Sequence, residues 1–212
     1  MIEAHTDGRF YELSDMVKAG SCDCKGCSAC CQGMGESIVL DPYDIFQLKI
    51  ATGKSFEALL QREISLCMKD GMILPVIRMD QEKDYCSFLQ EGRCSIHQYR
   101  PGLCRLFPLG RNFENGKLNY ILLKDTCQRP MVKVKVSRFI GVENIVRYDT
   151  FVTDWHYFVK SMKELLSTMT SEQAKTCNMY LLNVFFIKEY SLELDFYSEF
   201  YNRLQYIQNN IK

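Results

Sequence analysis

The sequence lacks a charge excess, a long apolar run and an apolar leader. Its 212 residues carry 26 basic and 26 acidic side chains, so the net charge is zero. A balanced charge gives no electrostatic reason to expect a nucleic acid or a membrane surface as partner. No apolar stretch is long enough to cross a bilayer, and Met1–Tyr11 has no apolar core of the kind found in secretion signals. We therefore expect a cytoplasmic protein whose thiols stay reduced.

The chain also lacks the common signatures of catalytic sites. It has no Walker loop, no complete Gly-x-Gly-x-x-Gly fingerprint and no Cys-x₃-Cys-x₂-Cys radical motif. A Rossmann-type site for S-adenosylmethionine is therefore not supported, although other methyl-donor folds stay open. Of the histidines, His97 is close to a cysteine, and we expect it to pack or hydrogen-bond rather than bind metal. His5 lies near the terminus, and His156 lies in an apolar helical stripe. Whether the protein is an enzyme stays open on these grounds.

Cysteine is abundant, and four of the 11 cysteines fall within eight residues. Cys24, Cys27 and Cys30 are separated by two residues each, and Cys31 follows directly. Thiolates are soft ligands, and this spacing lets one tight loop direct successive sulfurs at one metal centre. In a reducing compartment such clustering indicates metal ligands rather than disulfides. The sequence thus predicts a metal-binding loop.

A second group of cysteines lies beside turn residues, prolines and arginines. Its members are Cys86, Cys94, Cys104 and Cys127. Loops with Pro and Gly hold thiolates at a low entropic cost. Three arginines neighbour these cysteines, and arginine can donate to thiolate sulfur and offset the negative charge of a cluster. We assign this cofactor-contacting role to Arg105, because it follows Cys104 inside a proline-bounded segment.

These motifs together resemble the YkgJ-type cysteine-cluster family of zinc- or iron-chelating domains. The resemblance is carried by the Cys-x₂-Cys-x₂-Cys-Cys loop, a strand, and a helix that starts at Asp41-Pro42. It continues through Cys-x-Phe-Leu, Gly-Arg-Cys-Ser-Ile and Arg-Pro-x-x-Cys-Arg-x-Phe-Pro, and covers residues 24–130. The family is related to flagellin lysine N-methylases, and members are often named Fe–S oxidoreductases. Neither name is an activity that the residues themselves establish.

The resemblance implies a set of metal ligands. They are Cys24, Cys27, Cys30, Cys31, Cys86, Cys94, Cys104 and, as an eighth, Cys127. Eight thiolates allow two Cys₄ zinc sites, or one [4Fe–4S] cluster with thiols left for a second centre. The first three cysteines match a ferredoxin loop, so we favour iron–sulfur over zinc. We expect the adjacent sulfurs of Cys30 and Cys31 to point apart, so that they serve two centres or bridge a dinuclear one.

The fold class expected is α+β, in two units. Residues 1–130 form an irregular metal-binding unit with short strands and two helices. Residues 131–212 form a helical annex with apolar stripes over 151–169, 171–185 and 196–211, which packs on the first unit or forms a dimer. The remaining cysteines are expected to be bystanders: Cys22, and also Cys67 and Cys177, which we place on apolar helical faces.

Local signals predict several elements of the first unit. Asp41 and Gly53 bound one helix, and Ser55 begins a second that carries Ile64 and Cys67. Short strands are expected at 37–40, 72–79 and 85–89, and Asn115-Gly116 predicts a hairpin. Residues 10–17 suggest one or two amphipathic helical turns.

Two functions fit these observations. The first is a metal-cluster protein with redox or methyl-transfer activity. The second is a non-catalytic metallodomain in which the metal stabilises the fold and the annex binds a protein partner. An open coordination position, or a pocket of Tyr and acidic residues beside the cluster, would favour the first. A closed site ligated only by thiolates would favour the second.

Overall fold

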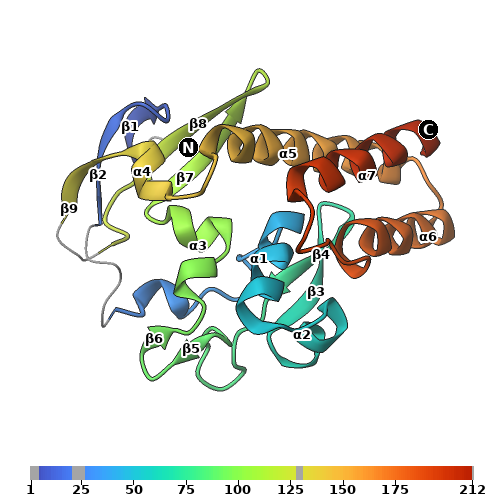
Figure 1. Cartoon of the computed structure of the whole chain (residues 1–212), viewed down its shortest axis with the longest axis horizontal. Helices are drawn as coiled ribbons and strands as arrows, with labels where there is room; N and C mark the ends of the chain where they lie inside the picture. Colours follow the sequence, from blue (N-terminus) through green and yellow to red (C-terminus); the bar gives the residue numbers. More distant parts are fainter. Residues whose placement is uncertain (1–4, 21–26, 128–130, 212) are drawn as a thin grey trace.

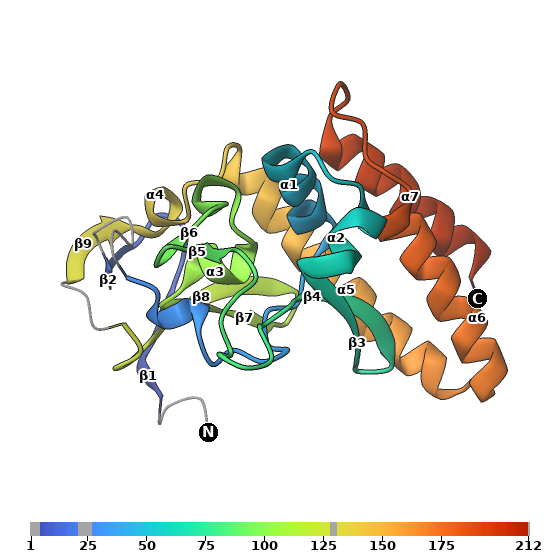
Figure 2. The same cartoon turned by 90° about the horizontal axis from the view of Figure 1, so that it is seen from below.

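The structure, a computed structural model, describes residues 5–20, 27–127 and 131–211 and confirms the α+β class. The strands β1, β2 and β9 lie at one end of the molecule and the helices α6 and α7 at the other (Figure 1). The cysteine-bearing segments lie between them, as the turned view in Figure 2 also shows. None of the helices in the described ranges is both long and apolar enough to cross a membrane.

The N-terminal segment forms strands, so the expectation of helical turns there is wrong. Strand β1 (Thr6–Tyr11) pairs with β8 (Lys117–Leu123), and β2 (Met16–Gly20) pairs with β9 (Met131–Lys135). In β2 the side chains of Val17 and Ala19 are buried and alternate with exposed ones, which is the two-residue period of a strand. The pairing partners lie more than a hundred residues away, so local periodicity misleads here.

The first helix agrees with its sequence signals. Helix α1 (Pro42–Thr52) begins at the N-cap Asp41, which accepts from the backbone N–H of Asp44, and ends at Gly53 with a φ of 68°. A left-handed C-cap of this kind suits glycine. Residues 38–40 pair with the next sheet through an isolated bridge between Val39 and Val76, rather than as a full strand.

The second helix is shorter than expected. Helix α2 (Phe56–Arg62) is followed by β3 (Ile64–Lys69), which pairs with β4 (Met72–Ile77). The turn between the strands is Asp70-Gly71, with φ values of 51° and 83°, and Asp-Gly favours such hairpins. Cys67 therefore lies on a strand and not on an apolar helical face. Its Sγ donates to Glu36 Oε2 over 2.7 Å.

The hairpin at Asn115-Gly116 is confirmed. Strand β7 (Leu109–Glu114) pairs with β8 from Leu109–Leu122 to Glu114–Lys117. Of the strand expected at 85–89, only β5 (Leu89–Gln90) is regular, and it pairs with β6 (Arg93–Cys94).

The helical stripes of the C-terminal region are confirmed. They form α5 (Ile145–Ser167), α6 (Ser171–Leu182) with the π-turn η4 (Asn183–Ile187), and α7 (Phe196–Asn210). Before them, β9 and the short helix α4 (Val136–Ile140) return to the N-terminal strands, which the sequence did not indicate. One connected core of buried side chains extends through both parts of the chain. The boundary at residue 130 stays a prediction.

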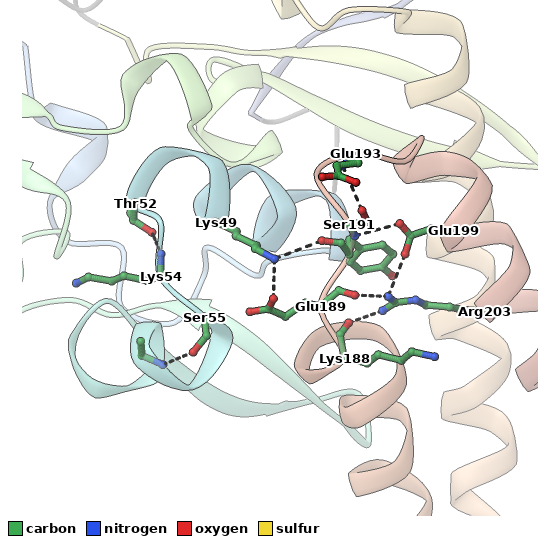
Figure 3. A network of polar contacts seen from close by, with 12 residues as sticks. Lys49, Thr52, Lys54, Ser55, Lys188, Glu189, Ser191, Glu193, Glu199 and Arg203 are labelled. Carbon is green, nitrogen blue, oxygen red and sulfur yellow. Dashed lines mark hydrogen bonds and ion pairs between the residues drawn. The ribbon is translucent and has the colours of Figure 1, made fainter.

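Polar contacts, which Figure 3 shows, and an aromatic contact fix helix α1 to the C-terminal helices. Lys49 Nζ donates to Glu189 Oε2 over 2.7 Å and to the carbonyl of Tyr190 over 3.4 Å. Arg203 holds the same segment by donating to the carbonyl of Glu189 over 2.7 Å. The Tyr43 ring meets that of Phe196 edge-on, with centroids 5.1 Å apart. The helix that precedes the second cysteine group thus has a rigid support.

Candidate metal centre

Six cysteines line one cavity of about 280 Å³. They are Cys27, Cys30, Cys31, Cys86, Cys94 and Cys104. Ile38, Ile77, Phe88 and Ile96 provide apolar walls. The fold therefore brings part of the N-terminal loop and most of the second cysteine group to a single site.

Backbone hydrogen bonds join the two cysteine groups directly. The N–H of Cys86 donates to the carbonyl of Cys31 over 2.8 Å, and the N–H of Gly33 donates to that of Asp84 over 2.9 Å. An isolated antiparallel bridge pairs Gln32 with Tyr85. Next along the chain, Cys94 pairs with Leu89 across the β5–β6 hairpin. Ladder bonds thus hold Cys31, Cys86 and Cys94 near one another.

Cys104 reaches the cavity from the short helix α3 (Gly102–Leu106), which α1 positions. The N–H of Gly102 donates to Asp44 Oδ1 over 2.8 Å, while Asp44 Oδ2 accepts from the N–H of Asp41 over 3.1 Å. A Cβ at residue 102 would lie 2.5 Å from the hydroxyl of Tyr148, so only glycine permits this approach. Burial raises the pKa of Asp44, and Arg111 acts in the opposite direction. One buried carboxylate therefore caps α1 and anchors the helix that carries Cys104.

We expect Asp44→Ala to lower the free energy of unfolding by about 2 kcal/mol, because it leaves two N–H groups without their acceptor. Gln173→Ala is a matched control. Gln173 holds the same third position in the capping box of α6, but it is exposed and does not line the cysteine cavity. Its loss should cost less than about 1 kcal/mol. Urea unfolding measures both. Equal costs would show that Asp44 acts only as a helix cap.

Two arginines and a histidine also line the cavity: Arg93, Arg100 and His97. Arg100 Nη1 lies against the ring of His97, 3.2 Å from Nδ1. Arg100 Nε is buried and has no hydrogen-bond partner within the described part of the chain. A cationic group with a spare donor thus lies beside the thiols.

The thiols differ in pKa because their surroundings differ. The Cys31 thiol hydrogen-bonds to the sulfur of Cys30, which lowers the pKa of Cys30 and raises that of Cys31. Burial raises the pKa of Cys86, Cys94 and Cys104. Because the sulfurs of Cys30 and Cys31 hydrogen-bond to each other, they do not point apart as expected, while their service of two centres or of a dinuclear one stays a prediction. The 3-10 turn η2 (Ala29–Cys31) carries both of them to the cavity.

A family model described as "CxxCxxCC: Putative zinc- or iron-chelating domain" matches residues 23–128. The chain belongs to the CxxCxxCC family. This supports metal binding and does not distinguish zinc from iron. No curated protein and no solved structure matches the chain. The matched range contains every cysteine of the cavity, whereas the C-terminal helices lie outside it.

The donor chemistry of this CxxCxxCC site fits a metal, since thiolates bind zinc and iron alike. Within residues 5–20, 27–127 and 131–211, however, no three His, Cys, Asp or Glu side chains converge as the ligands of one ion do. The six cysteines line one cavity of about 280 Å³. A single zinc ion needs four sulfurs drawn in to about 2.3 Å, while a cluster of several atoms occupies more of such a space.

Three predicted site residues are not placed at the cavity. Cys24 lies outside the described residues, as does the bystander Cys22. Cys127 is partly buried but does not line the cavity. Arg105 points elsewhere, with Nη2 donating to the carbonyl of Gln98 over 2.7 Å. Arg100 lies where we expected Arg105. The sequence signal for Arg100 is that it begins the Arg-Pro-x-x-Cys motif, which ends at Cys104.

Arg105 lines a separate groove of about 580 Å³. Its other walls include Tyr43, Tyr99, Tyr197 and Asp195. Residues 97–105 separate this groove from the cysteine cavity, because His97, Arg100 and Cys104 face the cavity while Gln98, Tyr99 and Arg105 face the groove. A polar pocket with Tyr and acidic side chains therefore lies beside the cysteine site.

The expected bystander Cys177 lies far along the chain in α6, partly buried against the core.

Proposed function

We propose that this protein is a cytoplasmic iron–sulfur protein that holds its cluster in the cysteine cavity. The observation that supports this best is the set of six cysteines around one cavity of about 280 Å³. The thiolates would come from the six cysteines that line the cavity: Cys27, Cys30, Cys31, Cys86, Cys94 and Cys104. A bound cluster would provide one-electron chemistry.

The chain's own residues define what such a site can do. Isoleucine and phenylalanine side chains on the walls limit access of water, and such an apolar shell tunes a metal centre. The raised pKa of the buried thiols means that metal binding would displace protons. Backbone bonds between residues 31–33 and 84–86 would keep the thiols near one another during this exchange.

We expect protein purified without oxygen to contain iron and acid-labile sulfide and to absorb visible light. Elemental analysis and an absorption spectrum test this. Zinc in place of iron would keep the metal site but reject the cluster, and each zinc would require the thiols to move closer together. Absence of both metals would reject the proposed function altogether.

The groove favours a second candidate, an enzyme with redox or methyl-transfer activity. Its volume lies in the range of small-molecule sites, and it offers tyrosines and Arg105 to a ligand. Equilibrium dialysis with S-adenosylmethionine separates the methyl-transfer form of this candidate from a non-catalytic metallodomain, which would not bind it. A protein partner on the C-terminal helices belongs to the non-catalytic alternative.

A further inference from the structure

Arg100 occupies an unusual position for an arginine. It lines the cysteine cavity and is half-buried, with Nη1 held at the ring of His97. Its Nε–H is fully shielded from solvent yet has no acceptor within the described ranges. None of the ion pairs in those ranges involves it, so no carboxylate neutralises its charge.

A buried donor without an acceptor costs about 1–3 kcal/mol, and more when the group is charged. A native site tolerates such a donor when a bound group supplies its acceptor. The other polar side chains of the cavity walls are the six thiols, Arg93 and His97. The guanidinium is a positively charged donor and a thiolate is a negatively charged acceptor, so the two are complementary. Arg93 is a second cation and offers no acceptor. The ring of His97 is already engaged with Nη1, so the sulfurs are the remaining side-chain acceptors on these walls.

We propose that Arg100 donates its Nε–H to a thiolate ligand of the metal centre and offsets the centre's negative charge. This proposal rests on the proposed function, because it needs bound metal. The sulfurs of Cys30 and Cys94 are the candidates, because both residues line the cavity together with Arg100 and lie within reach of its charge. The ring of His97 holds the guanidinium through its contact with Nη1. Arg100 is therefore a charge-compensating residue next to the ligands.

A thiolate that accepts a hydrogen bond is a weaker nucleophile. Removing the donor should therefore speed alkylation of the metal-bound sulfurs by iodoacetamide, in which sulfur displaces iodide. We expect Arg100→Gln to raise the rate at Cys30 or Cys94 roughly tenfold, the factor that corresponds to one hydrogen bond to a charged group. Mass spectrometry of the tryptic peptides follows each site. Cys67 and Cys177 serve as internal standards for the reagent.

Arg93→Gln is the matched control. It removes the same charge from a residue that lines the same cavity, but Arg93 is exposed. We expect its alkylation rates to stay within about twofold of the wild type, because solvent screens an exposed charge. Arg100→Lys should give an intermediate rate, since it restores the charge without the directed Nε–H.

Metal content is measured first in every variant. Wild-type protein without metal would reject the proposed function and this proposal together. Wild-type metal content with unchanged rates in Arg100→Gln would overturn the role of Arg100 alone, and so would an equal effect of Arg93→Gln. If Arg100→Gln cannot retain metal, the comparison uses Arg100→Lys. A wild-type rate in metal-loaded Arg100→Lys would then overturn the proposal.

Discussion

Serine at Cys86 or Cys104 should remove most of the bound metal. Both side chains line the cysteine cavity, and a serine hydroxyl is a hard, weakly acidic donor that replaces a thiolate poorly. Loss of an outer hydrogen-bonding partner alone costs 10–100-fold in metal affinity, so loss of a ligand should exceed about a hundredfold. Elemental analysis after gel filtration with a weak competing chelator measures the effect.

Cys67→Ser and Cys177→Ser are the controls, and both should keep wild-type metal content. Cys67 lies on β3 and donates to Glu36, while Cys177 lies on α6. Equal metal loss in both groups would show that the cysteines have been divided wrongly. Cys127→Ser addresses the difference between the family resemblance and the cavity. Metal loss in this variant would mean that residue 127 joins the site when metal is bound.

The elements predicted best from the sequence are those whose signals are local. Asp41 and Gly53 bound α1 because a side-chain cap and a left-handed residue act within one turn of the helix. Asn115-Gly116 specifies its hairpin for the same reason. The long C-terminal helices follow from apolar side chains at helical intervals, which need no knowledge of the partner surface.

The errors have a common physical origin, which is dependence on distant partners. Strands β1 and β2 form because they pair with β8 and β9, which lie far along the chain. Cys67 lies on a strand and not on the expected helix because β3 pairs with β4. The same holds at the site. Adjacency in the chain suggested Arg105, but α3 directs Cys104 to the cavity and Arg105 to the opposite groove. Cysteine spacing indicates a ligand group, whereas side-chain direction requires the fold.

Removal of the metal should expose the cysteine-bearing segments to hydrogen exchange and leave the helices protected. The elements of these segments are short. The strands β5 and β6 have two residues each, and η2 and η3 (His97–Tyr99) have three. Bringing such segments together closes long loops, at an entropic cost that weak local structure does not offset. Structural metal sites can contribute on the order of 10 kcal/mol, which does offset it.

The structure also limits how far this unfolding should spread. Helix α1 is tied to α7 and to residues 189–190 through Tyr43 and Lys49, and β4 packs against α5 and α6. We therefore expect amides of residues 27–33 and 84–106 to exchange at least a hundredfold faster after complete chelation. Amides of α6 and α7 should change by less than about twofold. Mass spectrometry of peptic fragments, with and without chelator, resolves these segments.

The opposite result would change the functional interpretation. If protection of residues 84–106 survived metal removal, the backbone bonds from Cys31 and Gly33 and the anchor at Asp44 would be sufficient to hold the cavity open. The metal would then occupy a preformed site instead of stabilising the fold. A metal that the fold does not need for its stability is available for electron transfer or ligand binding. That result would favour the redox or methyl-transfer function over the non-catalytic metallodomain.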